Sequence, residues 1–443
     1  MTIIALVDCN NFFVSCERSA DPALEGRPVV VLSNNDGCII SRSDEAKQLG
    51  IRMGEPYFKI REQLKQKQVR VFSSNFALYS AKSVQVMELL KQFSNILEFY
   101  SIDESFLNLN HIPPRMLRDF ALEMKGKIKQ QSGIPVSIGI AETKTLAKLA
   151  NAIAKKAKRF EGVLNLYQSP HLDLALSRTP VEKVWGVGRR NAIALRNANV
   201  LTARDLRDTK DSWILRRFNV VMMKTVLELR GTPCLPIQQS PPERKSVMYS
   251  RSFGTLIETQ QHMEAAVSDF TARAAEKLRE AGMAAHYLSV YMRTSKYLAP
   301  DARYSTSGEL WLPAATDCTH DLIREALGIT RRIFREGFQY YKVAILLTEL
   351  VPASEKQMSL FETRDVNQLQ TLMQTLDSIN HTFGARTLQY AAEGLQKPWS
   401  SKKEILSSAG MAATTEMSKT KTQPLSKTVS PRPLLGFVHP VHG

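Results

Sequence analysis

Three acidic residues that lie far apart in the sequence, Asp8, Asp103 and Glu104, could together support phosphoryl-transfer chemistry. Asp8 ends a short apolar run that is typical of a buried strand, and the other two acids lie in the predicted hairpin YSIDESF. If this strand and hairpin are neighbours in one sheet, the three carboxylates converge at its edge. Without counter-ions they would repel one another, and their pKa values would rise.

Hard cations such as Mg²⁺ would relieve this repulsion, because they prefer carboxylate oxygens and phosphates as ligands. Two such ions can stabilise both the attacking and the leaving oxygen of an in-line displacement at phosphorus. The alternative is structural: Asp103 and Glu104 could be turn residues, and Asp8 could cap a helix. Spacing alone does not decide between the two interpretations.

A basic helix is predicted over residues 143–158. At about 100° per residue, its lysines fall on one face and its apolar residues on the other. The lysines are Lys144, Lys148 and Lys155, and the apolar residues are Leu146, Leu149 and Ile153. Such a helix could present ammonium groups to a triphosphate or a DNA backbone, although a solvated charged face is the alternative. The pattern Gly139-x-x-x-x-Lys144 is not an NTPase P-loop, because Thr143 stands where the second glycine is required.

Two further motifs are typical of binding rather than of catalysis. The segment WGVGRR places Gly186 and Gly188 before Arg189 and Arg190 at the start of a helical run, as in a helix-hairpin-helix that grips a DNA backbone through helix-start amides. An ordinary turn is the alternative. The segment QMSLF follows the last predicted strand and suits docking into a groove of a partner protein, although it could also be a loosely packed core edge. Its contact residues would be Gln357, Met358, Leu360 and Phe361.

The composition indicates a nucleic-acid partner. The 443 residues include 59 Lys+Arg and 43 Asp+Glu, which gives a formal charge of +16. Such a surplus favours a polyanion, either nucleic acid or an acidic membrane surface. No apolar run approaches the roughly 18–20 residues of a membrane helix, and the N-terminus lacks the basic region of a signal peptide. The five cysteines are scattered without a C-x-x-C motif, so we expect a cytoplasmic protein without disulfides, zinc or a membrane partner.

The elements that must position the acids follow the order β-α-β-β-α-β, interrupted by an insertion at residues 11–73. The predicted strands are residues 3–7, 96–101, 104–109 and 136–141, and the helices are residues 78–94, a stripe with Leu117, Phe120, Met124 and Ile128, and residues 143–158. This order is the split βαβ arrangement of ferredoxin-like domains, which host many functions. The fold class is therefore α+β.

The rest of the chain contains a helical region, a second domain and a tail. Residues 170–232 read as helical, and the proline-rich residues 233–243 suit a linker. From about residue 244 the order β-α-β-β-α-β recurs, with strands at 246–253, 285–294, 304–311 and 339–349 and helices at 262–280 and 317–336. Beyond residue 405 the chain is rich in Ser, Thr, Lys and Pro, so we expect residues 405–443 to be disordered.

These motifs, taken together, resemble the Y-family translesion DNA polymerases, and within them the UmuC-type catalytic subunit of bacterial DNA polymerase V. The resemblance covers residues 1 to about 400, and it is carried by DCNNFF (8–13), SNNDGC (33–38), YSIDES (100–105), GIAETKTLAKLAN (139–151) and VWGVGRR (184–190).

The resemblance implies a domain organisation. It makes residues 1–10 and 74–166 a catalytic palm, residues 11–73 the fingers and residues 167–232 a helix-hairpin-helix thumb. Residues 244–352 would be the little finger, and residues 353–404 a clamp- and partner-binding region.

The resemblance also assigns roles. Asp8, Asp103 and Glu104, with the Cys9 carbonyl, would hold two Mg²⁺ ions. Phe13 would be the steric gate that excludes a ribose 2′-OH, with Phe12, Lys47 and Lys155 beside the incoming nucleotide. Asp44 replaces a tyrosine found in other branches of the family, and QMSLF resembles a sliding-clamp-binding motif.

The function implied is error-prone DNA synthesis opposite damaged template during the SOS response. The implied partners are primer–template DNA, dNTPs, a β sliding clamp, a UmuD′-type dimer and a RecA filament. Two other classes remain: a non-catalytic DNA- and clamp-binding scaffold, and a different palm-like nucleotide enzyme such as a cyclase. The scaffold would extend no primer, and the cyclase would be indifferent to primed DNA.

Overall fold

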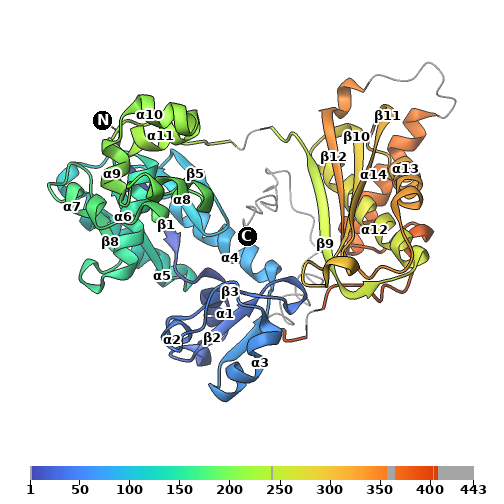
Figure 1. The fold of residues 1–443 in the computed structure, drawn as a ribbon, viewed down its shortest axis with the longest axis horizontal. Helices are drawn as coiled ribbons and strands as arrows, with labels where there is room; N and C mark the ends of the chain where they lie inside the picture. Colours follow the sequence, from blue (N-terminus) through green and yellow to red (C-terminus); the bar gives the residue numbers. More distant parts are fainter. Residues whose placement is uncertain (1, 241–242, 357–364, 403, 408–443) are drawn as a thin grey trace.

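The computed structural model describes residues 2–240, 243–356, 365–402 and 404–407. Within these residues the chain builds three β-sheets with helices packed around them. In Figure 1 the β1-containing sheet and the helices α7–α11 lie on one side, and the sheet of β9–β12 lies on the other. We name the parts palm, fingers, thumb and little finger after the regions expected from the sequence.

The palm sheet has the strand order β5-β6-β1-β7-β8. Its strands are β1 (Ile4–Cys9), β5 (Leu97–Phe99), β6 (Glu104–Asn108), β7 (Val136–Ala141) and β8 (Val163–Asn165). The first four have the antiparallel order of a ferredoxin-like sheet, as predicted. Strand β8 pairs parallel to β7 and was not predicted, because three residues give little periodicity.

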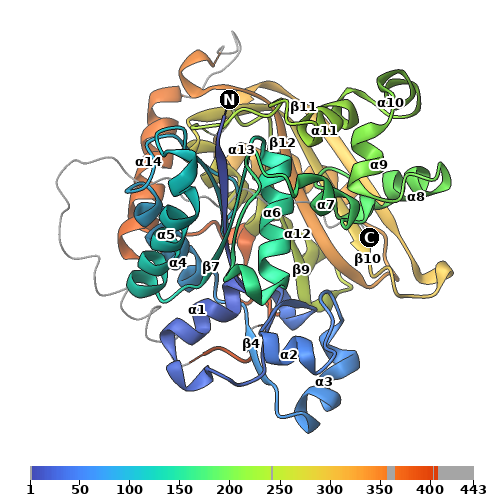
Figure 2. The ribbon, with the colours of Figure 1, turned by 90° about the vertical axis from the view of Figure 1, so that its left-hand side faces the viewer.

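Helices cover both faces of this sheet. They are α4 (Phe76–Leu90), α5 (Leu117–Ser132) and α6 (Lys144–Lys156). Side chains alternate along each strand, so Val7 and Ile138 pack toward α4 and α5, whereas Leu6 and Phe106 pack toward α6. The site-bearing ends of β1 and β6 are therefore fixed between two buried layers. In Figure 2, α5 and α6 lie on either side of the palm strands.

Gly139 has a packing role in this arrangement. A Cβ atom there would lie 2.2 Å from the Asn151 backbone nitrogen and 2.3 Å from the Ala147 carbonyl oxygen. Only glycine lets α6 lie this close to β7. The glycine thus supports helix–sheet contact, in agreement with the rejection of a P-loop from the sequence.

The fingers form a small separate sheet with the order β3-β2-β4. Their elements are α1 (Phe12–Ala20), β2 (Val29–Leu32), β3 (Ile39–Arg42), α2 (Asp44–Gln48), α3 (Tyr57–Gln66) and β4 (Arg70–Ser73). Val30, Ile39 and Leu64 contribute to a core of their own. Helix α1 lies at the junction, because Phe12 and Val14 belong to the palm core.

The thumb is helical, as its sequence pattern predicts. Its helices are α7 (Leu172–Ser177), α8 (Arg189–Asn197), α9 (Ala203–Asp208), α10 (Asp211–Arg217) and α11 (Val220–Leu229). Its buried residues Leu195, Leu206 and Leu229 share one core with Leu6 and Leu146 of the palm. The thumb is thereby packed directly on the α6 side of the palm sheet.

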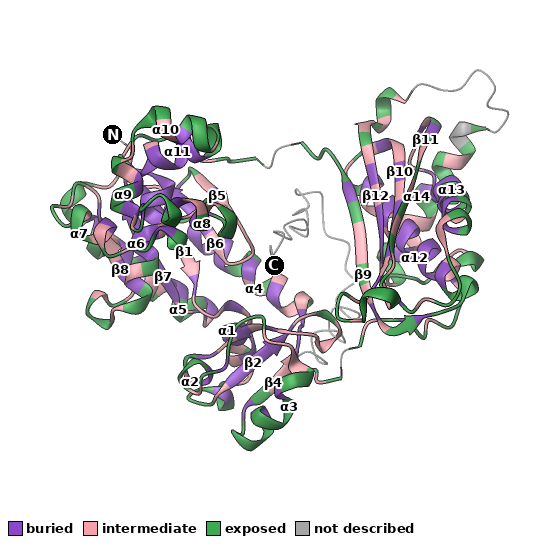
Figure 3. Ribbon diagram, viewed as in Figure 1, coloured by how far each residue is buried: buried purple, intermediate pink, exposed green. Residues whose placement is uncertain are grey.

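The little finger repeats the element order of the palm but not its strand order. It contains β9 (Val247–Ile257), α12 (Gln260–Glu280), β10 (Met283–Thr294), β11 (Ser305–Thr316), α13 (Thr319–Ile333) and β12 (Tyr340–Pro352). The sheet order is β11-β10-β12-β9, with every pair antiparallel. The first strand is therefore an edge strand here, whereas β1 is central in the palm. Figure 3 shows a separate buried layer in each of the two sheets.

The C-terminal region packs on the little finger. Helix α14 (Val366–Phe383) is held by Asp377, which accepts two hydrogen bonds of 2.6 and 2.7 Å from Arg279. Further on, Trp399 is buried against Phe253 and Phe270. This region is an extension of the little-finger core.

The expected disorder from residue 405 is wrong for the first residues of the tail. The Ile405 amide donates to the Ser73 hydroxyl at 3.0 Å, and Ser407 is buried. Local composition missed this order because the partner lies in the fingers. Residues 408–443, and the predicted clamp motif at residues 357–361, lie outside the described residues.

Candidate active site

The register of β1 and β6 brings two of the predicted acids together. Asp8 and Glu104 are directly opposite each other in the antiparallel ladder, and the Cys9 amide donates to the Asp103 carbonyl at 2.8 Å. Directly opposed residues project to the same face and lie about 5 Å apart. The two carboxylates from distant parts of the chain therefore lie side by side at the strand ends.

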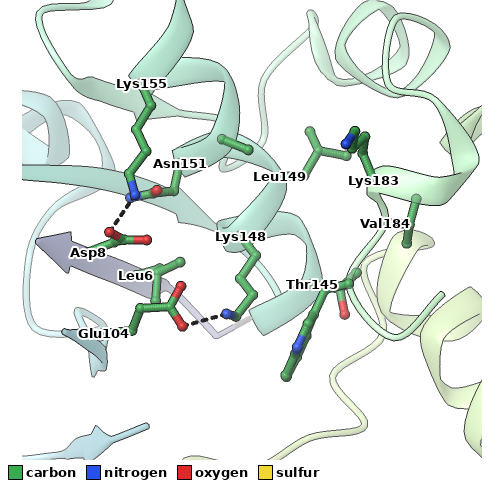
Figure 4. A pocket seen from close by; sticks show the side chains of 12 residues that line it. Leu6, Asp8, Glu104, Thr145, Lys148, Leu149, Asn151, Lys155, Lys183 and Val184 are labelled. Carbon is green, nitrogen blue, oxygen red and sulfur yellow. Dashed lines mark hydrogen bonds and ion pairs between the residues drawn. The ribbon is translucent and has the colours of Figure 1, made fainter. Parts of the chain in front are cut away.

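Helix α6 presents two lysines to this pair. Lys155 forms an ion pair with Asp8, and Lys148 forms one of 2.8 Å with Glu104 (Figure 4). The Lys148 ammonium also lies over the rings of Tyr100 and Trp185, at 4.6 and 5.2 Å from their centroids. The carboxylates and ammonium groups line an open groove of about 270 Å³, together with Leu6, Thr145, Leu149, Asn151, Ala152, Lys183, Val184 and Trp185.

Asp103 occupies a different position. Its carboxylate accepts a 2.6 Å hydrogen bond from the Ser101 hydroxyl, and it borders a narrow space next to Cys9 and Ser105 on the α4 side. Among the described residues, no three His, Cys, Asp or Glu side chains are already gathered as metal ligands. In this structure each of the three predicted carboxylate ligands has a protein partner instead: Asp8 has Lys155, Glu104 has Lys148, and Asp103 has Ser101.

Burial and the clustered negative charges destabilise the ionised carboxylates of the site, so a bound cation would stabilise them. Burial and, to a lesser extent, the neighbouring charges of Glu104 and Asp103 raise the pKa of Asp8 to about 7, against the opposing effect of Lys155. Burial also raises the pKa of Asp103, although its hydrogen bond from Ser101 counteracts this. The buried Cys9 thiol has a pKa well above its usual value, which leaves its carbonyl oxygen as the available ligand.

The donor set fits Mg²⁺. The carboxylates of Asp8, Asp103 and Glu104 and the Cys9 carbonyl are hard oxygen donors, the type that this ion prefers. The two lysines supply positive charge at the same place, so a phosphate group could take them over when cations replace them at the carboxylates.

Phe13 and Phe12 have different surroundings. The half-buried Phe13 ring stacks on Tyr79 with centroids 4.6 Å apart, and the Tyr79 hydroxyl donates to Glu17 at 2.7 Å. This contact fixes the ring in one place. Phe12 is only 4% exposed and belongs to the palm core, so only its backbone could contact a nucleotide.

Lys47 lies on α2, near the start of α1. Its ammonium donates to Asn11 and to Asp44, each at 2.7 Å. The Lys47 hydrogen bond is the main cause of a lowered pKa at Asp44. Asp44 thus neutralises the lysine that the family resemblance places on the phosphates.

Lys144 does not share the exposed face expected for it. It is 4% exposed, pairs with Glu98 and donates to the Pro236 carbonyl at 2.7 Å. Glu98 in turn accepts from the Gln238 amide at 2.7 Å. Helical spacing placed Lys144 with Lys148 correctly, but the linker that covers it comes from 92 residues later in the sequence.

We expect Lys144→Ala to lower the free energy of unfolding by about 3 kcal/mol, because it leaves the Glu98 carboxylate buried without its partner. Chemical denaturation would measure this loss. The matched variant Lys156→Ala, on the exposed side of α6, should change stability by less than about 0.5 kcal/mol. Equal stability of both variants would contradict a structural role for Lys144.

The predicted helix-hairpin-helix motif begins α8. Gly186 adopts a φ of 90°, and a Cβ there would lie 2.9 Å from the Thr225 hydroxyl oxygen. Gly188 is the N-cap of α8, and Arg189 and Arg190 are exposed directly after it. The geometry leaves both guanidinium groups free to approach a phosphate backbone.

Several residues of the groove were not predicted as site residues from the sequence. Lys148 shares the basic face that could approach a triphosphate or DNA backbone, but only Lys155 of that face is predicted as a nucleotide-binding residue; the spacing of seven between the two lysines was the available signal. Lys183 and Trp185 come from the thumb, and nothing in the local sequence places them beside the palm acids.

Two family models that match separate parts of the chain belong to the same protein family. Residues 7–152 match the model of the impB/mucB/samB family, and residues 244–360 match the model of its C-terminal domain. Residues 370–419 match a domain of unknown function (DUF4113), which sequence analysis did not identify.

The chain is 41% identical to Protein UmuC of Salmonella typhimurium, over 91% of this chain and 97% of the relative. It is 38% identical to Protein SamB of Salmonella typhimurium, over 92% and 97%. It is 25% identical to DNA polymerase IV 2 of Halalkalibacterium halodurans, over 89% and 95%.

Among solved structures, a chimera of the Y-family DNA polymerases Dbh and Dpo4 superposes with a TM-score of 0.66 at 19% identity, covering 79% of this chain and 99% of that one. This likeness supports the fold. Within the described residues, no helix is both long and apolar enough to cross a membrane.

Proposed function

Since the chain belongs to the impB/mucB/samB family of UmuC-type proteins, we propose that it is an error-prone, DNA-directed DNA polymerase that extends primers opposite damaged template. The observation that carries this proposal is the Asp8–Glu104 pair facing Lys148 and Lys155 in one groove. A site of this composition handles phosphates and hard cations, and the net charge of +16 suits a DNA substrate.

We propose that Asp8, Asp103 and Glu104, with the Cys9 carbonyl, hold two Mg²⁺ ions. When bound, these ions would neutralise charge on the attacking and leaving oxygens of the α-phosphate displacement. Lys155 and Lys148 already neutralise the carboxylates, and their ammonium groups would orient the triphosphate. Phe13, held against Tyr79, would lie under the sugar, and Lys47 would approach the phosphates from the fingers.

Gly186, Gly188, Arg189 and Arg190 at the start of α8 would hold the DNA backbone without reading its sequence. Base selection would then rest on pairing with the template. This implies low fidelity and tolerance of lesions, as in the Y-family.

The proposal is tested by primer extension across an abasic site. The purified full-length chain, with Mg²⁺ and dNTPs, should add a nucleotide opposite the lesion, and added UmuD′-type dimer and RecA filament should stimulate it. Extension that is absent under every condition, with DNA binding intact, would favour the scaffold. Nucleotide turnover that is independent of primed DNA would favour a different palm-like enzyme.

We also propose that Gln357, Met358, Leu360 and Phe361 bind a β sliding clamp. Replacing Leu360 and Phe361 by alanine should remove clamp stimulation of synthesis and leave clamp-independent synthesis unchanged. Synthesis on a circular primed template loaded with the clamp measures clamp stimulation. Synthesis on a short linear template measures clamp-independent activity. Equal loss on both templates would point to misfolding rather than to clamp binding.

A further inference from the structure

The C-terminal segment crosses from the little finger to the fingers. We call residues 399–402 and 404–407 the strap. At its start, the Trp399 carbonyl accepts a 3.0 Å hydrogen bond from the Gly254 amide of β9, and the Trp399 ring is buried in the little-finger core. At its end, the Ile405 carbonyl accepts a 2.8 Å hydrogen bond from the Ser73 amide of β4, and the Ile405 amide donates to the Ser73 hydroxyl at 3.0 Å. One short segment is therefore fastened to both parts.

The loop of residues 33–38, the SNNDGC motif, receives the middle of the strap. The Asn35 side chain accepts from the Lys402 amide at 2.9 Å and donates to the Ser252 carbonyl of β9 at 2.6 Å. Next to it, Asp36 accepts from the Glu404 amide at 3.1 Å. A single asparagine thus joins the fingers, the little finger and the strap.

The conformation of this loop is unusual. Asn35 and Asp36 both adopt left-handed backbone angles, with φ of 59° and 49°. Asn and Asp tolerate this region better than other side chains, but two in succession cost free energy that their surroundings must offset. The hydrogen bonds to the strap and to β9 supply that compensation.

The strap adds a second attachment to the little finger. The first is the linker after α11, which is anchored to the palm through Lys144 and Glu98. Figure 1 shows the linker and the strap joining the two halves at opposite ends of the space between them. A domain held by one flexible linker can rotate, whereas one held at two separated points keeps its orientation.

We propose that the strap and the SNNDGC loop form a latch that fixes the little finger beside the fingers before DNA arrives. A preorganised cleft loses less conformational freedom on binding, so the latch should strengthen the grip on primed DNA. The effect on DNA rests on the proposed function, but the effect on domain position does not.

Two variants of the full-length chain release the latch from opposite sides. Gly254→Ala places a Cβ 2.2 Å from the Ser400 carbonyl oxygen and displaces the strap from β9. Asn35→Gly removes both side-chain hydrogen bonds while keeping the left-handed backbone free of strain. The matched controls are Gly328→Ala, where a Cβ meets open space, and Asn34→Ala, an exposed neighbour in the same loop.

Small-angle X-ray scattering should show a larger maximum dimension for both release variants and an unchanged one for both controls. Fluorescence anisotropy with a primer–template should show Kd raised roughly five- to tenfold in the release variants. Thermal denaturation identifies a release variant that fails to fold. In that case the other release variant tests the latch. Unchanged scattering in a folded release variant would overturn the latch, and tighter DNA binding would show that the strap obstructs the cleft instead. If the unmodified chain binds no primed DNA, the proposed function fails while scattering still tests the latch.

Discussion

Replacing Asp8 or Glu104 by alanine should reduce nucleotide incorporation by roughly 10³-fold or more while primed DNA still binds. The two residues form one cross-strand pair, so each substitution removes half of the oxygen donors on the groove face. It also leaves Lys155 or Lys148 without its carboxylate, so the lysines that line the groove are less completely neutralised. Single-turnover incorporation at saturating DNA would measure the loss, and a gel shift would measure DNA binding.

Measuring the free energy of unfolding separates a loss of catalysis in these variants from misfolding. Burial raises the pKa of Asp8 to about 7, so in the metal-free protein its ionised form opposes folding, and that cost grows as pH rises from about 4 to 7. Asp8→Ala removes this cost, so the free energy of unfolding at neutral pH should rise rather than fall. Glu88→Ala, which removes an exposed acid of α4, is the matched control and should retain full activity. Synthesis by either Asp8→Ala or Glu104→Ala would refute the metal assignment.

Asp103→Ala tests a separate point. Its carboxylate is bound to Ser101 and does not line the groove. If it joins Asp8 and Glu104 when cations bind, its loss should be as severe as theirs. A much milder loss would reduce the proposed ligands to the cross-strand pair and the Cys9 carbonyl.

Phe13→Ala should raise the ratio of rNTP to dNTP incorporation by roughly 10²-fold, because the discrimination against one extra hydroxyl is of this size. The ring is held by its 4.6 Å stack on Tyr79, which is itself fixed by the buried Glu17. It therefore cannot move aside for a 2′-OH. Competition between a ribonucleotide and its deoxy counterpart in primer extension would measure the ratio.

A matched variant distinguishes shape from stability. Phe13→Tyr keeps the ring and should keep the discrimination, whereas Phe13→Ala should lose it at unchanged dNTP turnover. An unchanged ratio in Phe13→Ala would remove this residue from the gate. A fall in incorporation of both nucleotides would mean that the stack supports the palm core instead.

Local pattern predicted most of the elements. The continuous apolar run in Ile4–Cys9 reflects a strand buried on both faces, and the 3.6-residue period of α6 reflects which side of that helix is buried. Both signals lie within a few consecutive residues. The same patterns indicated the acids and the basic face that meet in the groove. They failed for Lys144, because a helical face does not show which part of it a distant linker will cover.

Residue types and local periodicity established which side chains make up the site and the order along the chain of most strands and helices in the palm and the little finger. Tertiary structure decided how the little-finger strands pair, which acids share the groove, and that the strap reaches the fingers. These features rest on contacts between residues such as Asn35 and Lys402, which are 367 positions apart. Such contacts form only when packing brings separate elements together, and they leave no periodic signal in either segment.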